Sequence, residues 1–326
     1  MRVLLVDSID PAGERLLREG GASVTTAPEG SADTIRRLAR DADALIIRSR
    51  LPDDIFDAAP GVRAVTIHGT GTDLVPLESA AAHGVAVANL PGGNAQSVAE
   101  YCAMAMLMLA RNVVAITTAM HAKPWDEARR LGAESRELAT LTAGIVGVGE
   151  IGRRLARILR DGFQMRVLGN QRRLDRLPPQ AEPAALDELV AQSDFLVVAC
   201  PLTSETRHLF NRARLAKMKP SAWLVNVGRG PVVEEAALID ALRERRIAGA
   251  MLDVYEHYRI DQNHPLLALD NAVLTPHLAG MTRDSRGRVS VLAAEDTLRM
   301  LAGDAPRHLV NPEVWNRFLE RRSANR

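Results

Sequence analysis

Short apolar runs alternate with amphipathic stretches along the first part of the chain. The runs are RVLLVD from residue 2, DALIIRS from residue 43, VRAVTIH from residue 62 and VAVANL from residue 85. Stretches with the apolar spacing of helices lie between them, and the first covers residues 11–19. This alternation predicts βαβ units and a parallel sheet.

A second series of apolar runs follows later in the chain. Its six members are AGIVGV from residue 143, MRVLG from 165, FLVVAC from 195, WLVNVG from 223, AGAMLDV from 248 and AVLTP from 272. Most are apolar throughout, as expected for parallel strands that are buried on both faces. Helical stretches that begin near residues 150, 186 and 234 are expected to cover this second sheet.

The segment between the two series predicts a division into two domains. A helix is expected over residues 96–114 and an irregular stretch over residues 121–138. We therefore predict an α/β protein of two doubly wound parallel-sheet units rather than one large sheet. A last helical segment over residues 284–301 is expected to return to the first unit, and the chain ends in the polar tail SANR.

The composition and charge indicate what kind of molecule the protein binds. The chain has 326 residues, of which 47% are hydrophobic and 25% charged, and this length favours two globular domains. The 41 Lys and Arg residues nearly balance 40 Asp and Glu residues. No net field therefore attracts nucleic acid or an acidic membrane surface, and a small-molecule partner is expected.

The cysteines and the apolar segments indicate the cellular compartment of the protein. Cys102 and Cys200 lack the spacing of metal ligands, so we expect neither a metal site nor a disulfide framework. The N-terminus turns acidic after a few apolar residues, unlike a signal peptide. The longest apolar run, residues 101–110, is shorter than the roughly 20 residues of a spanning helix. These features predict a soluble, cytoplasmic protein.

A glycine motif follows the first strand of the second series. Gly147, Gly149 and Gly152 form G-x-G-x-x-G where a strand is expected to turn into a helix, which Glu150 and Ile151 open. The first glycine permits a tight turn, the second lets backbone amides approach a pyrophosphate, and the third allows close packing. The motif predicts a dinucleotide site, with a plain glycine turn as the alternative.

The end of the next strand indicates which dinucleotide binds. An NAD site usually carries an acidic residue about 20 positions after the glycines. This chain instead has Asn170, followed by Gln171, Arg172 and Arg173. Arginine guanidiniums suit a 2′-phosphate, so we predict that NADP is preferred and that NAD can also bind. The alternative is a solvated basic turn.

Four further segments occur in a fixed order along the chain. They are NAQSVAEY at residue 94, CPLTSETRHLFN at 200, NVGRGPVVEEAAL at 226 and LTPHLAG at 274. With the glycine motif they resemble the D-isomer-specific 2-hydroxyacid dehydrogenase family over nearly the whole chain, and VVACPLT is most similar to glyoxylate and hydroxypyruvate reductases. The resemblance implies an NAD(P)-dependent oxidoreductase that reduces a small 2-oxo acid to the D-2-hydroxy acid.

The resemblance also implies an architecture. A Rossmann cofactor domain, residues 101–291, is inserted in a flavodoxin-like substrate domain that consists of residues 1–100 and 292–326. In such enzymes the active site lies in the cleft between the domains, hinge motion closes it, and the cofactor domain usually mediates a homodimer.

Two residues match the catalytic needs of this reduction. Arg229, in NVGRG, is implied to bind the substrate carboxylate and to polarise the ketone, at a strand end where open α/β sheets place ligands. His277, in TPHLAG, is implied as the general acid, because imidazole titrates near the working pH. Without the motif, an arginine after a strand is more often a surface charge, and a lone histidine is more often structural. The motif context favours a catalytic role for both.

The resemblance assigns further residues to the cofactor. Cys200, Pro201, Val227 and Gly228 follow strands of the second series. Asp253 corresponds to the family's contact with the nicotinamide carboxamide, and a plain strand-end turn is its alternative.

The substrate loop is also implied by the resemblance. The loop after VRAVTIH places Gly69 and Thr70 where backbone amides bind the substrate carboxylate. Arg48 ends the strand DALIIRS where the family often has a residue facing the cleft, and a solvated strand-end charge is equally compatible.

The chain departs from the family at one catalytic position. Members usually carry a glutamate five residues after the strand-end aspartate, which orients and charges the histidine, but this chain has Tyr258. Either a loop rearrangement brings Glu256 to the imidazole, or Tyr258 offers only a neutral hydroxyl, which we favour. The departure motivates a second function, an NAD(P)-sensing binding protein with little turnover. An oxidoreductase for phosphorylated or other acids is a third, because it would share every motif described above. Retention of Arg229 and His277 favours the enzyme.

Overall fold

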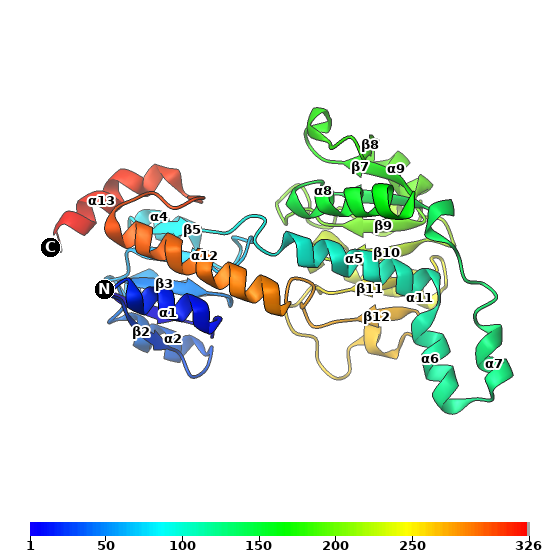
Figure 1. The fold of residues 1–326 in the computed structure, drawn as a ribbon, viewed down its shortest axis with the longest axis horizontal. Helices are drawn as coiled ribbons and strands as arrows, with labels where there is room; N and C mark the ends of the chain where they lie inside the picture. Colours follow the sequence, from blue (N-terminus) through cyan, green and yellow to red (C-terminus); the bar gives the residue numbers. More distant parts are fainter. Residues whose placement is uncertain (325–326) are drawn as a thin grey trace. The chain divides into compact units, whose positions relative to one another are not determined.

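The computed structural model describes residues 1–324 and divides the chain into two compact units (Figure 1). Unit 1 consists of Met1–Asn94 together with Met281–Arg326, and unit 2 consists of Ala95–Gly280. The expected boundaries at residues 100 and 291 differ from these, because helices α5 (Ala95–Ala110) and α12 (Arg283–Ala302) each remain whole within one unit. Residues 325 and 326 of the polar tail lie outside the described residues.

Unit 1 contains a sheet of five parallel strands in the order β2-β1-β3-β4-β5. The strands are β1 (Arg2–Leu5), β2 (Ser23–Thr26), β3 (Ala44–Ile47), β4 (Ala64–Ile67) and β5 (Ala86–Ala88). Strands β3 and β4 are buried along their whole lengths, as inner parallel strands must be. The order is that of flavodoxin-like domains.

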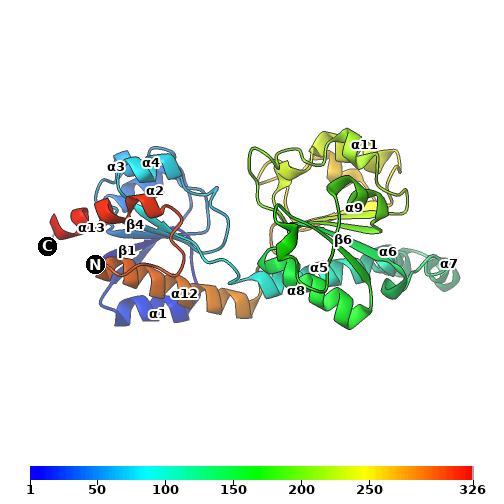
Figure 2. The same cartoon turned by 90° about the horizontal axis from the view of Figure 1, so that it is seen from above.

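Helices cover both faces of this sheet. They are α1 (Pro11–Glu19), α2 (Ala32–Ala39), α3 (Ile55–Ala58), α4 (Leu77–Ala82), α12 (Arg283–Ala302) and α13 (Trp315–Ala324). Helices α1 and α12 lie on one face and α2, α3 and α4 on the other (Figure 2). Val3 and Leu5 of β1 pack toward α1 and α12, whereas Leu4 and Val6 belong to the core under α2 and α3, because successive strand residues face opposite sides.

Unit 2 contains a sheet of seven parallel strands in the order β12-β11-β10-β9-β6-β7-β8. The strands are β6 (Thr142–Val146), β7 (Arg166–Asn170), β8 (Glu182–Pro183), β9 (Phe195–Val198), β10 (Trp223–Asn226), β11 (Gly249–Leu252) and β12 (Ala272–Leu274). This is the Rossmann order with one additional edge strand, β12. The predicted fold class of two parallel-sheet α/β domains is confirmed.

The helices of unit 2 also form two layers. They are α5 (Ala95–Ala110), α6 (Val113–Ala122), α7 (Trp125–Arg130), α8 (Glu150–Arg157), α9 (Leu186–Gln192), α10 (Arg212–Leu215) and α11 (Glu235–Arg243). Helices α5 and α8 cover one face of the sheet, and α9 and α11 cover the other (Figure 2). Each layer has its own apolar core against the strands.

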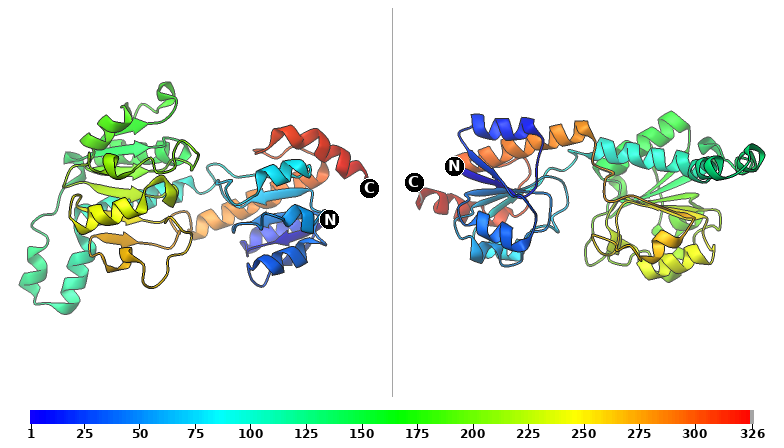
Figure 3. Two further views of the ribbon diagram at one scale, coloured as in Figure 1. Left: turned by 180° about the vertical axis from the view of Figure 1, so that it is seen from behind. Right: turned by 90° about the horizontal axis from the view of Figure 1, so that it is seen from below.

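The expected helix over residues 96–114 is two helices. Asn112 adopts the left-handed region with φ 52° between α5 and α6, and the two helix axes meet at a bend of 56°. The stretch 121–138, expected to be irregular, contains α7. Helices α6 and α7 project from the sheet layers of unit 2 (Figure 3). No single helix of the described residues is long and apolar enough to cross a membrane, and the bent pair α5 and α6 meets that criterion only by length and composition.

Candidate active site

The glycine motif lies at the turn from β6 into α8. Gly147 has φ 95°, a region that favours glycine, and a Cβ there would lie 2.5 Å from the backbone N of Cys200. A Cβ at Gly152 would lie 2.7 Å from the carbonyl O of Gly147, whereas a Cβ at Gly149 would meet nothing within 4 Å. The turn combines close packing with an open approach at its middle glycine. These residues therefore fit the pyrophosphate of a dinucleotide.

The other predicted cofactor residues of this sheet follow its strands. Cys200 and Pro201 follow β9, Val227 and Gly228 follow β10, and Asp253 follows β11. Strands β6 and β9 are neighbours, and the chain leaves β6 toward β7 on one side but leaves β9 toward β10 on the other. This is a topological switch point, where open α/β sheets bind ligands.

The basic turn after β7 is exposed. The Asn170 side-chain amide donates to the carbonyl of Ala184 at 2.8 Å, which fixes it to the sheet edge. Arg172 and Arg173 are both exposed, and Arg173 lies 3.6 Å from Asp175. No carboxylate ends β7, so the turn offers guanidiniums where an NAD site has an acid.

Sequence reasoning missed Arg153, which supports this basic turn. Arg153 lies in the first turn of α8 and donates through Nη2 to the carbonyl of Arg176 at 2.6 Å. Its guanidinium therefore connects the glycine-rich helix to the basic turn. A signal for it exists in the sequence, since Arg153 directly follows the last glycine of the motif.

Arg229 is held by the turn that follows β10. The side-chain nitrogen of Asn226 donates to the carbonyl of Arg229 at 3.2 Å, and the side-chain oxygen of Asn226 accepts from the N–H of Gly228 at 3.1 Å. A Cβ at Gly230 would lie 1.7 Å from the carbonyl O of Tyr255. The turn therefore packs tightly against the chain that follows β11, which places Arg229 near that segment.

His277 lies in a loop that Asp253 holds. Oδ1 of Asp253 accepts from Oγ1 of Thr275 at 2.6 Å and from the N–H of Leu278 at 2.8 Å, and Oδ2 accepts from the N–H of Ala279 at 2.8 Å. His277 itself has φ 55°. Asp253 is 1% exposed, and in this structure its carboxylate organises the His277 loop. Its contact with the nicotinamide stays a prediction.

The two candidate replacements for the usual glutamate lie in different surroundings. The Tyr258 ring is 67% exposed and packs edge-on against the His277 ring, with ring centres 5.8 Å apart and planes at 69°. Oε1 of Glu256 instead lies 3.5 Å from Nε2 of His208 and 3.9 Å from the Arg207 guanidinium. Sequence reasoning missed this pairing of Glu256, and the geometry favours Tyr258 as the neighbour of the imidazole.

The predicted substrate residues of unit 1 follow β3 and β4. Oδ2 of Asp7 accepts from the backbone N–H groups of Arg48 and Ser49, at 2.8 Å each, and fixes the turn after β3. The carbonyl of Thr70 accepts from the Asn89 amide at 2.6 Å. A Cβ at Gly69 would meet nothing within 4 Å, so there is open space beside this loop, and the Gly69 N–H donates to the carbonyl of Ile67 at 2.8 Å.

A half-buried histidine supports the same loop. Nε2 of His68 lies 2.8 Å from Oγ of Ser290, a residue of α12. Burial, reinforced by the guanidiniums of Arg48 and Arg286, lowers the pKa of His68 to about 4. His68 is therefore neutral at neutral pH, and the charge beside the substrate loop comes from the arginines.

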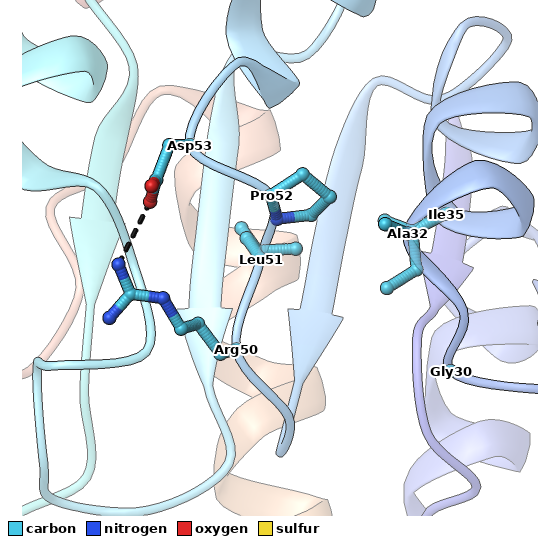
Figure 4. Close-up of a pocket in the computed structure, with 7 residues that line it drawn as sticks. All are labelled: Gly30, Ala32, Ile35, Arg50, Leu51, Pro52 and Asp53. Carbon is cyan, nitrogen blue, oxygen red and sulfur yellow. Dashed lines mark hydrogen bonds and ion pairs between the residues drawn. The ribbon is translucent and has the colours of Figure 1, made fainter.

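A small pocket of unit 1 lies apart from these residues. It has a volume of about 250 Å³ and is closed on one side by the ion pair of Arg50 and Asp53 at 2.9 Å (Figure 4). Ligand pockets usually occupy about 300–1,000 Å³. None of the predicted site residues lines this pocket, and we assign no ligand to it.

Comparison with known proteins identifies the family. The family profile described as "D-isomer specific 2-hydroxyacid dehydrogenase, NAD binding domain" matches residues 103–279. The chain is 38% identical to a glyoxylate reductase of Thermofilum pendens over 294 residues, which cover 87% of this chain and 86% of the relative. The chain belongs to the D-isomer-specific 2-hydroxyacid dehydrogenase family.

Further relatives carry more specific names. A glyoxylate/hydroxypyruvate reductase B of Yersinia pestis is 36% identical over 268 residues, which cover 81% of this chain and 82% of the relative. A crystal structure of the NADPH-dependent glyoxylate/hydroxypyruvate reductase of Sinorhizobium meliloti, in complex with NADP and malonate, has a TM-score of 0.83 and 27% identity, and covers 95% of this chain and 96% of that one. The predicted family, and with it an NAD(P)-dependent oxidoreductase, is confirmed.

Proposed function

We propose that this D-2-hydroxyacid dehydrogenase reduces a small 2-oxo acid of the glyoxylate or hydroxypyruvate kind to its D-2-hydroxy acid. The observation that carries the proposal is the shared carboxyl edge of one sheet: the glycine turn follows β6, Arg229 follows β10 and His277 follows β12. The names of the relatives favour the same substrate class.

Each site residue has a proposed step. The Arg229 guanidinium pairs with the substrate carboxylate and polarises the carbonyl oxygen. His277, as imidazolium, donates its proton to that oxygen as the ketone is reduced. The dinucleotide, when bound, supplies the hydride. Gly69 and Thr70 contribute backbone amides for the carboxylate, and Arg48 adds positive charge.

We also propose that NADP is the preferred cofactor. Arg172 and Arg173 offer two exposed guanidiniums after β7, and the Arg153 hydrogen bond supports their turn. A 2′-phosphate accepts charge-assisted hydrogen bonds from such groups, whereas a ribose hydroxyl gains less from them. NAD lacks that phosphate and is proposed as the weaker ligand.

A homodimer through unit 2 is the proposed assembly. Helices α5, α6 and α7 expose large apolar side chains, each 39–65% accessible: Met104, Leu107, Val113, Val114, Met120 and Trp125. A second copy of the chain is the proposed occupant of these helices, because large exposed apolar side chains that gather on successive helices favour association. Val114→Asp should yield monomers in sedimentation, whereas Leu267→Asp, a change at another exposed apolar site of unit 2, should leave the dimer intact.

The proposed partner is a small-molecule acid rather than nucleic acid or a membrane, and the proposed location is the cytoplasm. Cys102 and Cys200 are free and buried, and burial raises the pKa of the Cys200 thiol to about 11. Unreactive free thiols suit a reducing compartment.

The deciding experiment follows oxidation of NADPH and NADH with glyoxylate, hydroxypyruvate, pyruvate, a phosphorylated 2-oxo acid and bulkier 2-oxo acids. Rapid turnover of glyoxylate or hydroxypyruvate with NADPH is expected. Tight cofactor binding with negligible turnover of every acid would instead support the cofactor-sensing alternative that Tyr258 motivates.

A further inference from the structure

A chain of hydroxyl groups, from buried Tyr101 to half-buried Thr275, leads from helix α5 to the loop that carries His277. The Tyr101 hydroxyl lies 2.5 Å from Oγ1 of Thr275, and this Oγ1 lies 2.6 Å from Oδ1 of Asp253. A carboxylate only accepts hydrogen bonds, so Thr275 donates to Asp253 and accepts from Tyr101. Burial raises the pKa of the Tyr101 phenol, which keeps the donated proton in place.

A second tyrosine holds the main chain of the same residue. The Tyr255 hydroxyl donates to the carbonyl of Thr275 at 2.8 Å and lies 3.2 Å from the carbonyl of Leu252. Burial raises the pKa of Tyr255 to about 12, so this phenol also stays protonated. Thr275 is therefore bound at its side chain by Tyr101 and at its carbonyl by Tyr255.

The fixed Thr275 bears directly on the backbone at His277. A non-glycine residue in the left-handed region, such as His277 with φ 55°, is strained and persists only where its surroundings determine its conformation. Here the N–H of His277 donates to the carbonyl of Thr275 at 3.1 Å, and the N–H groups of Leu278 and Ala279 donate to Asp253. The turn is thus held on both sides of the histidine.

We propose that Tyr101 and Tyr255 are positioning residues for His277, which act through Thr275 to hold the left-handed turn and so orient the imidazole. The proposal rests on the proposed role of His277 as general acid.

The test removes single hydroxyl groups and separates rate from binding. Tyr101→Phe should lower kcat about tenfold on the best 2-oxo acid, with KM and the Kd of NADPH nearly unchanged. Thr275→Val should lower kcat further, and Thr275→Ser, which keeps the hydroxyl, should restore it to within a few-fold of wild type. The control is Thr297→Val in α12, which removes a buried threonine hydroxyl that is bound to the Ala293 carbonyl and to the Thr66 hydroxyl, and it should leave kcat unchanged.

A second measurement does not depend on turnover. Amide hydrogen exchange of the peptide that covers residues 275–280 should accelerate in Tyr101→Phe and Thr275→Val, but not in Thr275→Ser or Thr297→Val. Unchanged exchange and kcat in Tyr101→Phe and Tyr255→Phe would overturn the inference. If the wild type reduces no 2-oxo acid, the proposed function fails, while the exchange data still decide whether the tyrosines hold this turn.

Discussion

The glycine turn after β6 and the His277 turn after β12 lie on the same edge of one sheet, yet they are built in different ways. The first is a backbone device, in which three glycines within six residues provide the φ value, the close packing and the open approach. The second depends on side chains from distant segments, since Asp253, Thr275 and Tyr101 together hold His277. The glycine turn has no room for a side chain at Gly147 or Gly152, whereas the His277 turn can be weakened one side-chain group at a time.

The largest expected effect in this comparison is the loss of the His277 imidazole. His277→Ala should lower kcat/KM for reduction by about 10²- to 10⁴-fold, the usual contribution of a general acid, and leave the Kd of NADPH unchanged. Steady-state kinetics and fluorescence titration check the two parts. His121→Ala, at an exposed position of α6, is the control, and near wild-type turnover in His277→Ala would refute the assignment.

The glycine turn should respond to an added methyl group according to position. Gly147→Ala should lower both the melting temperature and cofactor affinity, because the left-handed conformation costs alanine about 1–2 kcal/mol and its Cβ would meet Cys200. Gly149→Ala has open space for its Cβ, so it should weaken NADPH at least tenfold without lowering the melting temperature. Calorimetry with and without NADPH separates the two, and equal destabilisation by both changes would contradict the roles of the two glycines.

Cofactor choice should change through the basic turn rather than the glycines. Arg172→Ala combined with Arg173→Ala should weaken NADPH binding by about 1.5–3 kcal/mol for each charge-assisted hydrogen bond that is removed and leave NADH binding almost unaffected. The ratio of kcat/KM for the two cofactors is the measurement. Arg207→Ala, a change of another exposed arginine of unit 2, is the control, and equal weakening of both cofactors would remove the arginines from the proposed phosphate site.

The smallest expected effect concerns the pH dependence of reduction. Reduction needs the imidazolium, so its rate falls as pH rises through the pKa of the histidine. A carboxylate at position 258 stabilises the imidazolium and raises that pKa, so Tyr258→Glu should move the falling limb of the kcat/KM profile to higher pH. Glu256→Gln should leave the profile in place, because Glu256 pairs with Arg207 and His208. A downward shift in Glu256→Gln would identify Glu256 as the partner instead.

The sequence predicts the central strands of both sheets because each is a short apolar run. It fails at the sheet edges. Strand β2 has the polar sequence SVTT with one buried residue, and β8 consists of two exposed residues, so neither has the apolar run by which a strand is recognised. The break at Asn112 is equally hidden, since a left-handed asparagine replaces the glycine or proline that usually marks the end of a helix.

In the candidate site too, the features set by local sequence could be predicted, and those that depend on contacts between distant residues could not. The glycine motif is contiguous, so its placement at a strand-to-helix turn could be read from spacing alone. The hydrogen bond of Tyr101 with Thr275 joins residues 174 positions apart, and no local pattern encodes it. The pairing of Glu256 with His208 spans 48 positions and likewise depends on how two loops meet after folding.

The insertion of unit 2 into unit 1 imposes an order on synthesis. Val3 and Leu5 of β1 pack in one core with Val289, Ala293 and Met300 of α12, which emerge from the ribosome only after all of unit 2. One apolar face of the first sheet therefore lacks the α12 part of its core until the whole of unit 2 has been translated. Apolar sheet surface that stays exposed during synthesis favours aggregation and chaperone binding. Helix α12 covers this surface when it packs on the first sheet, so its synthesis ends the period in which the nascent chain is most prone to aggregate.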